Sequence, residues 1–207
     1  MRKKVFFCLA AIIFSINISV TYAQTVRIIM QTSAGDIGLE LYPEKAPVTV
    51  RNFLKYVDGG YYGGGRFYRV VRADNQVQNK IKIGVIQGGM GRDVRDFPFA
   101  PIPLETTGNT GILHKDGVIS MARDKPGSAT SEFFICVQDQ PDLDFGGMRN
   151  PDGQGFAAFG KVISGMNIVR KIQNMATDQP KGNKLKFSSG QILSNPVIIT
   201  HTKRLTE

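Results

Sequence analysis

Apolar and polar residues alternate in two short stretches near the start of the chain. The first covers residues 26–30 (VRIIM) and the second residues 37–41 (IGLEL). A period of two is typical of strands with one buried face. The intervening TSAG, residues 32–35, favours a turn. The pattern therefore predicts an N-terminal antiparallel hairpin.

The apolar spacing then changes to that of a helix, with a stripe at Val50, Phe53, Leu54 and Val57. Positions i, i+3, i+4 and i+7 lie on one side of a helix. Pro47 suits the first helical position, and Gly59-Gly60 suits the end. A second helix is predicted over 166–175 from the shared face of Ile168, Val169, Ile172 and Met175.

Most of the remaining apolar segments are short and are separated by Gly and Pro. They indicate strands at 67–71, 82–87, 117–121, 133–137, 156–162 and 196–202. Many short strands and two helices predict a mainly β fold, a closed antiparallel barrel of about eight strands capped by two α-helices. Side chains fill the interior of such a barrel. We therefore expect a site on the outer wall or in the long connections Ala73–Ile81, Gly88–Thr110 and Gln138–Gly155.

The first 23 residues have the pattern of a secretory signal peptide. Arg2, Lys3 and Lys4 precede an apolar run from Val5 to Phe14, and Thr21-Tyr22-Ala23 offers small residues for cleavage. An uncleaved anchor is the alternative, but the run is short for a span of about 20 residues. We expect cleavage after Ala23, a domain covering residues 24–207, no stable membrane insertion afterwards, and a periplasmic or secreted protein.

Composition fits one compact domain. The chain has 207 residues, 42% of them hydrophobic and 21% charged. Removing residues 1–23 takes away three basic residues and no acidic ones, so the net charge falls from +9 to +6. Basic residues are scattered, apart from a short loop with Lys181, Lys184 and Lys186, and no nucleic-acid motif is present. We expect no nucleic-acid partner and a monomer.

One cysteine remains after cleavage, Cys136, so no intramolecular disulfide can form. Its apolar surroundings favour a buried strand thiol over a reactive nucleophile. The sequence has two histidines and lacks HExxH, CxxC and Gly-rich phosphate-loop motifs. We expect no metal and no cofactor. Asp142 and Asp144 lie in a short PDLD segment, which is more typical of a turn with capping acids than of a glycosidase pair.

Several blocks combine polar and apolar residues in an unusual way. Arg69 lies in an apolar strand, and alternation places it on the face of Phe67 and Val71, where a charge is costly unless it is paired or functional. The blocks are FYRVV (67–71), QGG (87–89), ISMA (119–122), FFI (133–135) and FGKV (159–162). In this order they resemble the cyclophilin family of peptidyl-prolyl cis/trans isomerases, from Val26 to about Thr200.

The resemblance implies an eight-stranded barrel with two helices and an outer groove for proline-containing peptides. Arg69 matches the catalytic arginine, and Gln87 matches the glutamine that holds it. The proline pocket would be formed by Phe134, Met121, Leu143 and Phe156. Ala122 would contact the peptide backbone, Val85 replaces a methionine, and Glu132 takes a position where glutamine is common.

The chain departs from the family pattern at three places. Seventeen residues separate Arg69 from Gln87, and the excess is a polar insertion, Ala73–Ile81. Gly84 stands where an aromatic residue often lines the pocket. Asp142 stands where a tryptophan or phenylalanine often contributes to cyclosporin binding, so we expect weak inhibition by cyclosporin.

Three functions follow as hypotheses. The first is an isomerase that acts on X–Pro bonds of exported proteins or peptides, without nucleophile or metal because no bond is broken. The second is a catalytically weak module of the same fold that binds proline-rich segments. The third is a basic scaffold for polyanions, whose binding would weaken strongly with salt.

Overall fold

The computed structural model describes residues 25–91, 97–178 and 188–205. The predicted signal peptide and the basic stretch around Lys184 lie outside these ranges. The strands are β1 (Val26–Thr32), β2 (Gly35–Leu41), β3 (Arg66–Val71), β4 (Val85–Gly89), β5 (Val118–Met121), β6 (Phe133–Cys136), β7 (Ala157–Ser164) and β8 (Ile192–Arg204). The helices are α1 (Pro47–Asp58), α2 (Thr107–Thr110), α3 (Met166–Gln173) and a 3-10 turn, η1 (Pro141–Leu143).

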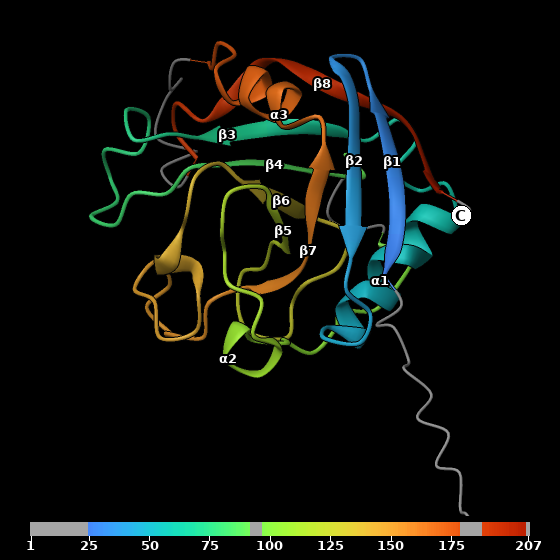
Figure 1. Ribbon diagram of the computed structural model, residues 1–207. Coiled ribbons are helices and arrows are strands. Elements are labelled where there is room, and N and C mark those ends of the chain that lie inside the picture. The colour runs from blue at the N-terminus through green and yellow to red at the C-terminus, as the bar shows by residue number, and fades with distance from the viewer. Residues whose placement is uncertain (1–24, 92–96, 179–187, 206–207) are drawn as a thin grey trace, which may run out of the picture.

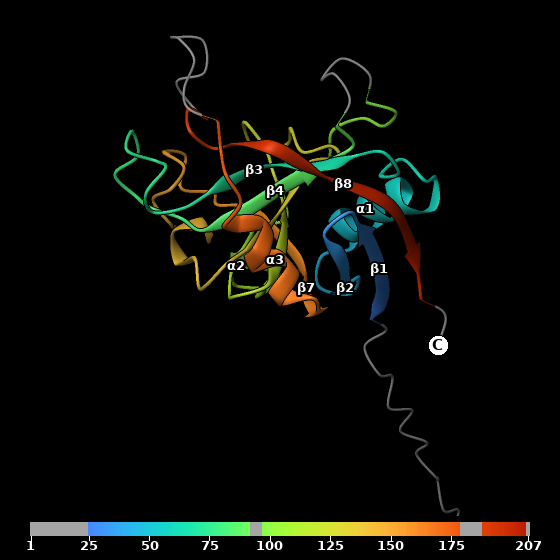
Figure 2. The same ribbon diagram turned by 90° about the horizontal axis from the view of Figure 1, so that it is seen from above.

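The eight strands close into one antiparallel barrel in the order β1-β2-β7-β5-β6-β4-β3-β8, with β8 returning to β1 (Figure 1). The N-terminal hairpin pairs Val26 with Leu41 and Thr32 with Gly35. The helices α1 and α3 cover different openings of the barrel (Figures 1 and 2). None of the helices in the described ranges is long and apolar enough to span a bilayer.

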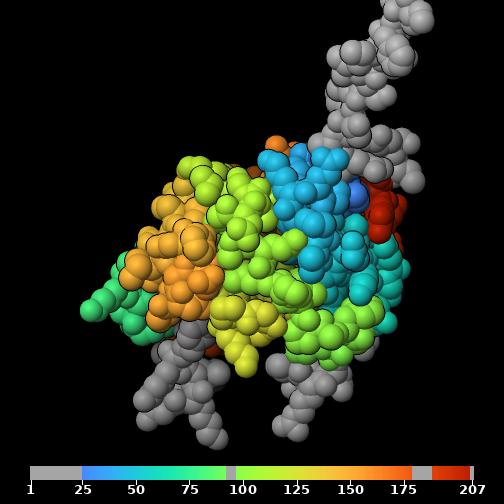
Figure 3. Space-filling view, turned by 90° about the horizontal axis from the view of Figure 1, so that it is seen from below, coloured from blue at the N-terminus to red at the C-terminus, as the bar shows by residue number. Residues whose placement is uncertain are grey.

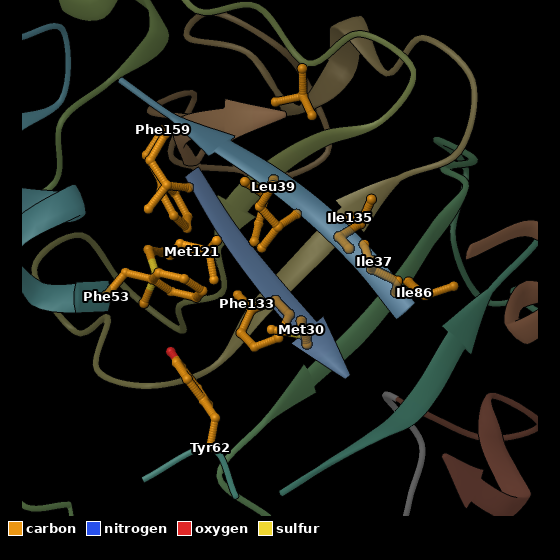
Figure 4. Close-up of a cluster of buried hydrophobic side chains, with 14 of the residues drawn as sticks. Met30, Ile37, Leu39, Phe53, Tyr62, Ile86, Met121, Phe133, Ile135 and Phe159 are labelled. Carbon is orange, nitrogen blue, oxygen red and sulfur yellow. The ribbon is translucent and has the colours of Figure 1, made fainter. Parts of the chain in front are cut away.

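The core fills the barrel interior, as the alternation predicts (Figure 4). Phe53 of α1 packs against Tyr62 and Phe159 with ring centroids 5.1 Å apart and against Phe133 at 5.6 Å. Strand β6 separates two environments, because Phe133 and Ile135 belong to the interior whereas Phe134 and Cys136 belong to a second cluster outside it. This outer cluster, with Val71, Val85 and Leu143, is where a site can form on the barrel wall.

The predicted barrel with its two capping helices is confirmed, but a short additional helix was not predicted and several strand boundaries differ. A third helix, α2, is four residues of TGNT and has no apolar periodicity that could reveal it. Strand β4 begins at Val85 rather than Lys82, because Gln76 instead hydrogen-bonds the backbone N–H and C=O of Ile83. Strand β8 begins at Ile192, four residues before the predicted start.

Candidate active site

A β-bulge in β3 determines which side chains reach the outer wall. The neighbouring residues Gly88 and Gln87 of β4 pair with Phe67 and Arg69 of β3. Tyr68 lies between these two residues of β3 and has no partner on β4, so it is the extra residue of the bulge. Bulges re-aim side chains and are common beside active sites. Phe67 points into the core, whereas Tyr68 and Arg69 both line an outer pocket. The prediction that Arg69 shares a face with Phe67 and Val71 is therefore wrong for Phe67, since simple alternation does not continue through a bulge. It is confirmed for Val71, which belongs to the outer cluster.

The outer pocket has a volume of about 1060 Å³ and combines an apolar wall with polar residues. Phe134 and Phe156 meet edge to face with ring centroids 5.3 Å apart, and Leu143 closes the same wall. The pocket brings together eight of the nine residues that the sequence singles out: Arg69, Gln87, Phe134, Ala122, Leu143, Phe156, Val85 and Glu132. Strands β3, β4 and β6 carry four of them: Arg69, Gln87, Phe134 and Val85.

Met121 is the residue that the structure does not bring to this pocket. Its side chain is 1% exposed and belongs to the interior cluster. Figure 4 shows it next to Phe53, on the inner side of the barrel. The next residue, Ala122, faces the pocket instead. Met121 therefore supports the core beneath the wall and does not line the pocket.

The guanidinium of Arg69 is held by two glutamine side chains. Its Nη1 donates to Gln87 Oε1 at 2.8 Å, while Nε and Nη2 donate to Gln191 Oε1 at 2.9 and 2.6 Å. Gln191 is fully buried, and its Nε2 donates to the carbonyl of Asn75 at 3.1 Å. Burial lowers the pKa of Arg69 to about 10, so the group remains charged at neutral pH. The pocket therefore contains a fixed cation beside an apolar wall.

A chain of hydrogen bonds continues from Gln87 to Glu132. Gln87 Nε2 donates to the Tyr68 hydroxyl at 2.8 Å, and this hydroxyl donates to Glu132 Oε2 at 2.7 Å. Burial raises the pKa of Glu132, although the Tyr68 hydrogen bond and Arg66 oppose the shift. Burial also raises the pKa of Tyr68. The Tyr68 hydroxyl therefore donates its proton to the carboxylate, and its oxygen accepts from Gln87 Nε2. This orients the Gln87 amide so that Oε1 faces Arg69.

Sequence reasoning missed three residues of this arrangement: Tyr68, Ile83 and Gln191. Tyr68 lies within the quoted FYRVV block, but its orientation depends on the bulge. Gln191 is 122 positions from Arg69 and has no local signal. Ile83 lines the pocket next to Gly84, where a Cβ would lie 2.8 Å from the carbonyl oxygen of Val137. An aromatic side chain therefore does not fit at Gly84 without a backbone shift.

A Ser–His–Asp arrangement lies behind the pocket wall. His114 Nδ1 is 2.7 Å from Asp144 Oδ1, and Nε2 is 3.0 Å from Ser120 Oγ. Ser120 is fully buried, and the His114 ring stacks behind Phe134 with centroids 5.9 Å apart. A substrate cannot reach this serine, so the arrangement supports the wall. Asp144 also accepts from the His114 backbone N–H. The acids of this segment do not cap η1 through their side chains, so the predicted capping role is wrong, because Asp144 contacts His114 instead.

Cys136 is fully buried in the outer cluster, as predicted. Burial raises the pKa of its thiol well above the ordinary value, and nearby carboxylates, including Asp144, act in the same direction. The thiolate is therefore disfavoured, and the alternative of a reactive nucleophile has no support in the geometry.

Comparison with known proteins gives the same result along the whole domain. The profile described as "Cyclophilin type peptidyl-prolyl cis-trans isomerase/CLD" matches residues 27–203. Peptidyl-prolyl cis-trans isomerase A of Dickeya dadantii is 34% identical over 98% of both chains. Peptidyl-prolyl cis-trans isomerase B of Escherichia coli is 35% identical over 70% of this chain and 83% of its own.

Solved structures show the same fold. A cyclophilin-type isomerase from Cryptosporidium parvum has a TM-score of 0.68 and 21% identity, and the match covers 89% of this chain and 99% of that chain. The structure of that protein in the presence of the dipeptide Ala-Pro matches with a TM-score of 0.66. The barrel, the outer pocket and these matches agree with one another. They show that the chain belongs to the cyclophilin-type peptidyl-prolyl cis-trans isomerase family.

Proposed function

We propose that this enzyme rotates X–Pro bonds of exported polypeptides in the pocket beside Arg69, using the guanidinium to stabilise the twisted bond. The observation that carries the proposal is the fixed position of Arg69. Two amide oxygens hold its donors at 2.6–2.9 Å beside the wall of Phe134, Leu143 and Phe156. A charged donor next to an apolar slot suits a proline ring and its nitrogen.

The chemistry of the bond explains why such a group is sufficient. Amide resonance opposes rotation with a barrier of roughly 18–20 kcal/mol, and X–Pro exchange takes tens to hundreds of seconds. At the transition state the bond is twisted and the prolyl nitrogen regains its lone pair. A donor placed at that nitrogen binds the twisted state better than either planar state, which is the condition for catalysis.

The other pocket residues would hold the two sides of the bond differently. Phe134, Leu143, Phe156 and Val85 would bind the proline ring and exclude water. Gln87 and the backbone at Ala122 would hold one side of the peptide while the other side rotates. Glu132 would act through Tyr68 on Gln87, in addition to any contact with the peptide.

The predicted signal peptide supports export as the cellular setting. Substrates would then be exported proteins, in the periplasm or outside the cell. N-terminal sequencing of the protein from a periplasmic or secreted fraction tests this proposal. We expect a chain that starts at Gln24. Protein found only in the cytoplasm with an intact N-terminus would contradict export and leave the enzymatic proposal unaffected.

A protease-coupled assay on a short Ala-Pro-Phe peptide separates the three hypotheses. We expect the slow phase of the assay, which is isomerisation of the Ala-Pro bond, to become faster in proportion to enzyme concentration. Binding of proline peptides without acceleration would support the non-catalytic module. Binding of polyanions that is unchanged by substitution of Arg69 and is lost with salt would support the scaffold.

Cyclosporin should inhibit the enzyme weakly. Nanomolar inhibition would contradict the interpretation of Gly84 and Asp142 as departures from the family's pocket.

A further inference from the structure

The insertion after β3 forms a fixed wall at one end of the pocket. Gln76 is fully buried, and its Nε2 donates to the carbonyls of Arg72 at 2.8 Å and Ile83 at 2.7 Å. This glutamine joins the two ends of the loop. Figures 1 and 2 show the loop at the ends of β3 and β4, on the same side of the barrel as residues 141–155. In Figure 3 the green surface of the insertion adjoins the orange surface of that segment.

Arg149 reaches from that segment to the insertion. Its Nη1 donates to Gln76 Oε1 at 3.0 Å and to the carbonyl of Ile81 at 2.5 Å, and its backbone N–H donates to the carbonyl of Asp142 at 3.1 Å. These contacts hold one nitrogen of the guanidinium, whereas Nε and Nη2 make no hydrogen bond to the described residues. Burial is the main reason that the pKa of Arg69 is lowered, and the nearby charge of Arg149 acts in the same direction.

Two other arginines of the pocket, Arg66 and Arg123, have carboxylates nearby, whereas Arg69 is held by the amide oxygens of Gln87 and Gln191. Arg123 pairs with Asp152 through two hydrogen bonds of 2.8 and 2.9 Å, and Arg66 lies beside Glu132. Within residues 25–91, 97–178 and 188–205, no carboxylate lies within ion-pair distance of Arg149. The half-buried cation therefore faces the pocket without a counter-charge, although burial lowers its pKa.

Two amide groups next to Arg149 also lack acceptors. Asn79 lies two residues before Ile81, and Asn150 follows Arg149 in the chain; both line the pocket. The Nδ2 of each is buried without a hydrogen-bond partner in the described part of the chain. Buried donors are normally satisfied. The open donors at this end of the pocket are therefore Nε and Nη2 of Arg149, and the two buried amides beside it leave its surroundings short of acceptors, so an anionic oxygen that binds the guanidinium would supply what this end of the pocket lacks.

We propose that this end of the pocket binds a carboxylate of the substrate, so that the enzyme prefers peptides with Asp or Glu close to the proline. This inference rests on the proposed function, because it assigns the substrate class of the same site. A guanidinium binds a carboxylate through paired, charge-assisted hydrogen bonds. The volume of about 1060 Å³ is large enough for residues that flank the proline ring.

The test compares matched peptides that carry Glu or Gln either immediately before or immediately after the proline. We expect kcat/KM to be about five- to tenfold higher for Glu than for Gln at one of the two positions, and this ratio to fall toward one as NaCl is raised. Ratios near one at both positions in low salt would overturn the proposal. Turnover of the Gln peptides tests the isomerase activity separately.

Variants then locate the preference. Arg149→Gln should reduce the Glu-to-Gln ratio to below about twofold, and Arg149→Lys should retain part of it. Asn79→Asp leaves Arg149 in place but supplies a competing carboxylate, and it should reduce the ratio as well. Arg51→Gln is the matched control, because it removes one exposed charge from α1 outside the pocket. A ratio that persists in Arg149→Gln, or that falls equally in Arg51→Gln, would overturn the proposal.

Discussion

At the scale of single residues, Arg69 is oriented by neutral oxygens. Gln87 and Gln191 hold its nitrogens at 2.6–2.9 Å without neutralising its charge. A carboxylate in place of either glutamine would bind the guanidinium more strongly and compete with the prolyl nitrogen. The arrangement therefore favours a charged group that is fixed in direction.

The hydroxyl of Tyr68 orients Gln87, so its removal should affect the rate more than binding. In Tyr68→Phe the Gln87 amide loses an acceptor at 2.8 Å and becomes free to flip its nitrogen toward Arg69. One hydrogen bond contributes roughly 0.5–1.5 kcal/mol, so we expect a fall in kcat of about two- to tenfold. Tyr61→Phe, which lies outside the pocket, is the control. Equal effects of the two substitutions would contradict the role of Tyr68.

The partly buried carboxyl of Glu132 should make stability depend on pH in a defined direction. Burial raises its pKa above the ordinary value of 4.5, so the folded state holds this proton more tightly than the unfolded chain. Its contribution to the free energy of unfolding should therefore fall as pH rises from about 4.5 through the raised pKa. Urea unfolding of wild type and Glu132→Gln over this range measures the difference. A wild type that gains stability relative to the variant as pH rises would contradict the assignment.

At the scale of elements, the insertion is an ordered wall. Gln76 is fully buried and bonds both ends of the loop and Arg149. Gln76→Ala leaves these groups without partners, at roughly 1–3 kcal/mol for each unsatisfied group. We expect faster amide hydrogen exchange over residues 73–83, with little change in the barrel. Val77→Ala, whose side chain is 88% exposed, is the control. Unchanged exchange in Gln76→Ala would show that another contact orders the loop.

Hydrophobic periodicity predicts helices and strands well where one face of the element is buried. It predicts them poorly where a bulge or a long-range hydrogen bond determines the backbone path. The hairpin of β1 and β2 and the helix α1 follow directly from periods of two and 3.6. The bulge at Tyr68 changes which face Arg69 occupies and leaves no trace in hydrophobicity. The late start of β4 depends on hydrogen bonds of Gln76 to Ile83, which a local pattern cannot reveal.

At the scale of the whole molecule, the barrel wall separates a packed interior from the outer cluster that carries the pocket. The family motifs place eight of nine candidate residues at that pocket, whereas Met121 faces the interior. The partners Gln191 and Arg149 could not be predicted, because they lie far along the chain from the groups they contact. Their positions depend on closure of the barrel and on the connection 144–156.

The buried thiol of Cys136 reports on the integrity of this wall. It is fully buried between strands, and burial raises its pKa well above the ordinary value. We expect negligible reaction with a disulfide reagent in the folded mature protein and rapid reaction in denaturant. Fast labelling of the folded state would contradict the packing of the outer cluster.

The most direct test of the account is the exchange rate of a bound X–Pro peptide, measured by NMR line shapes at saturation, together with its Kd. In Arg69→Ala we expect the rate to fall at least tenfold, about 1.4 kcal/mol of barrier, while Kd changes by less than about threefold and the barrel remains folded. Arg69→Lys retains the charge but not the planar donor, so its exchange rate should lie between those of wild type and Arg69→Ala. An unchanged rate in Arg69→Ala would contradict the central role of this guanidinium.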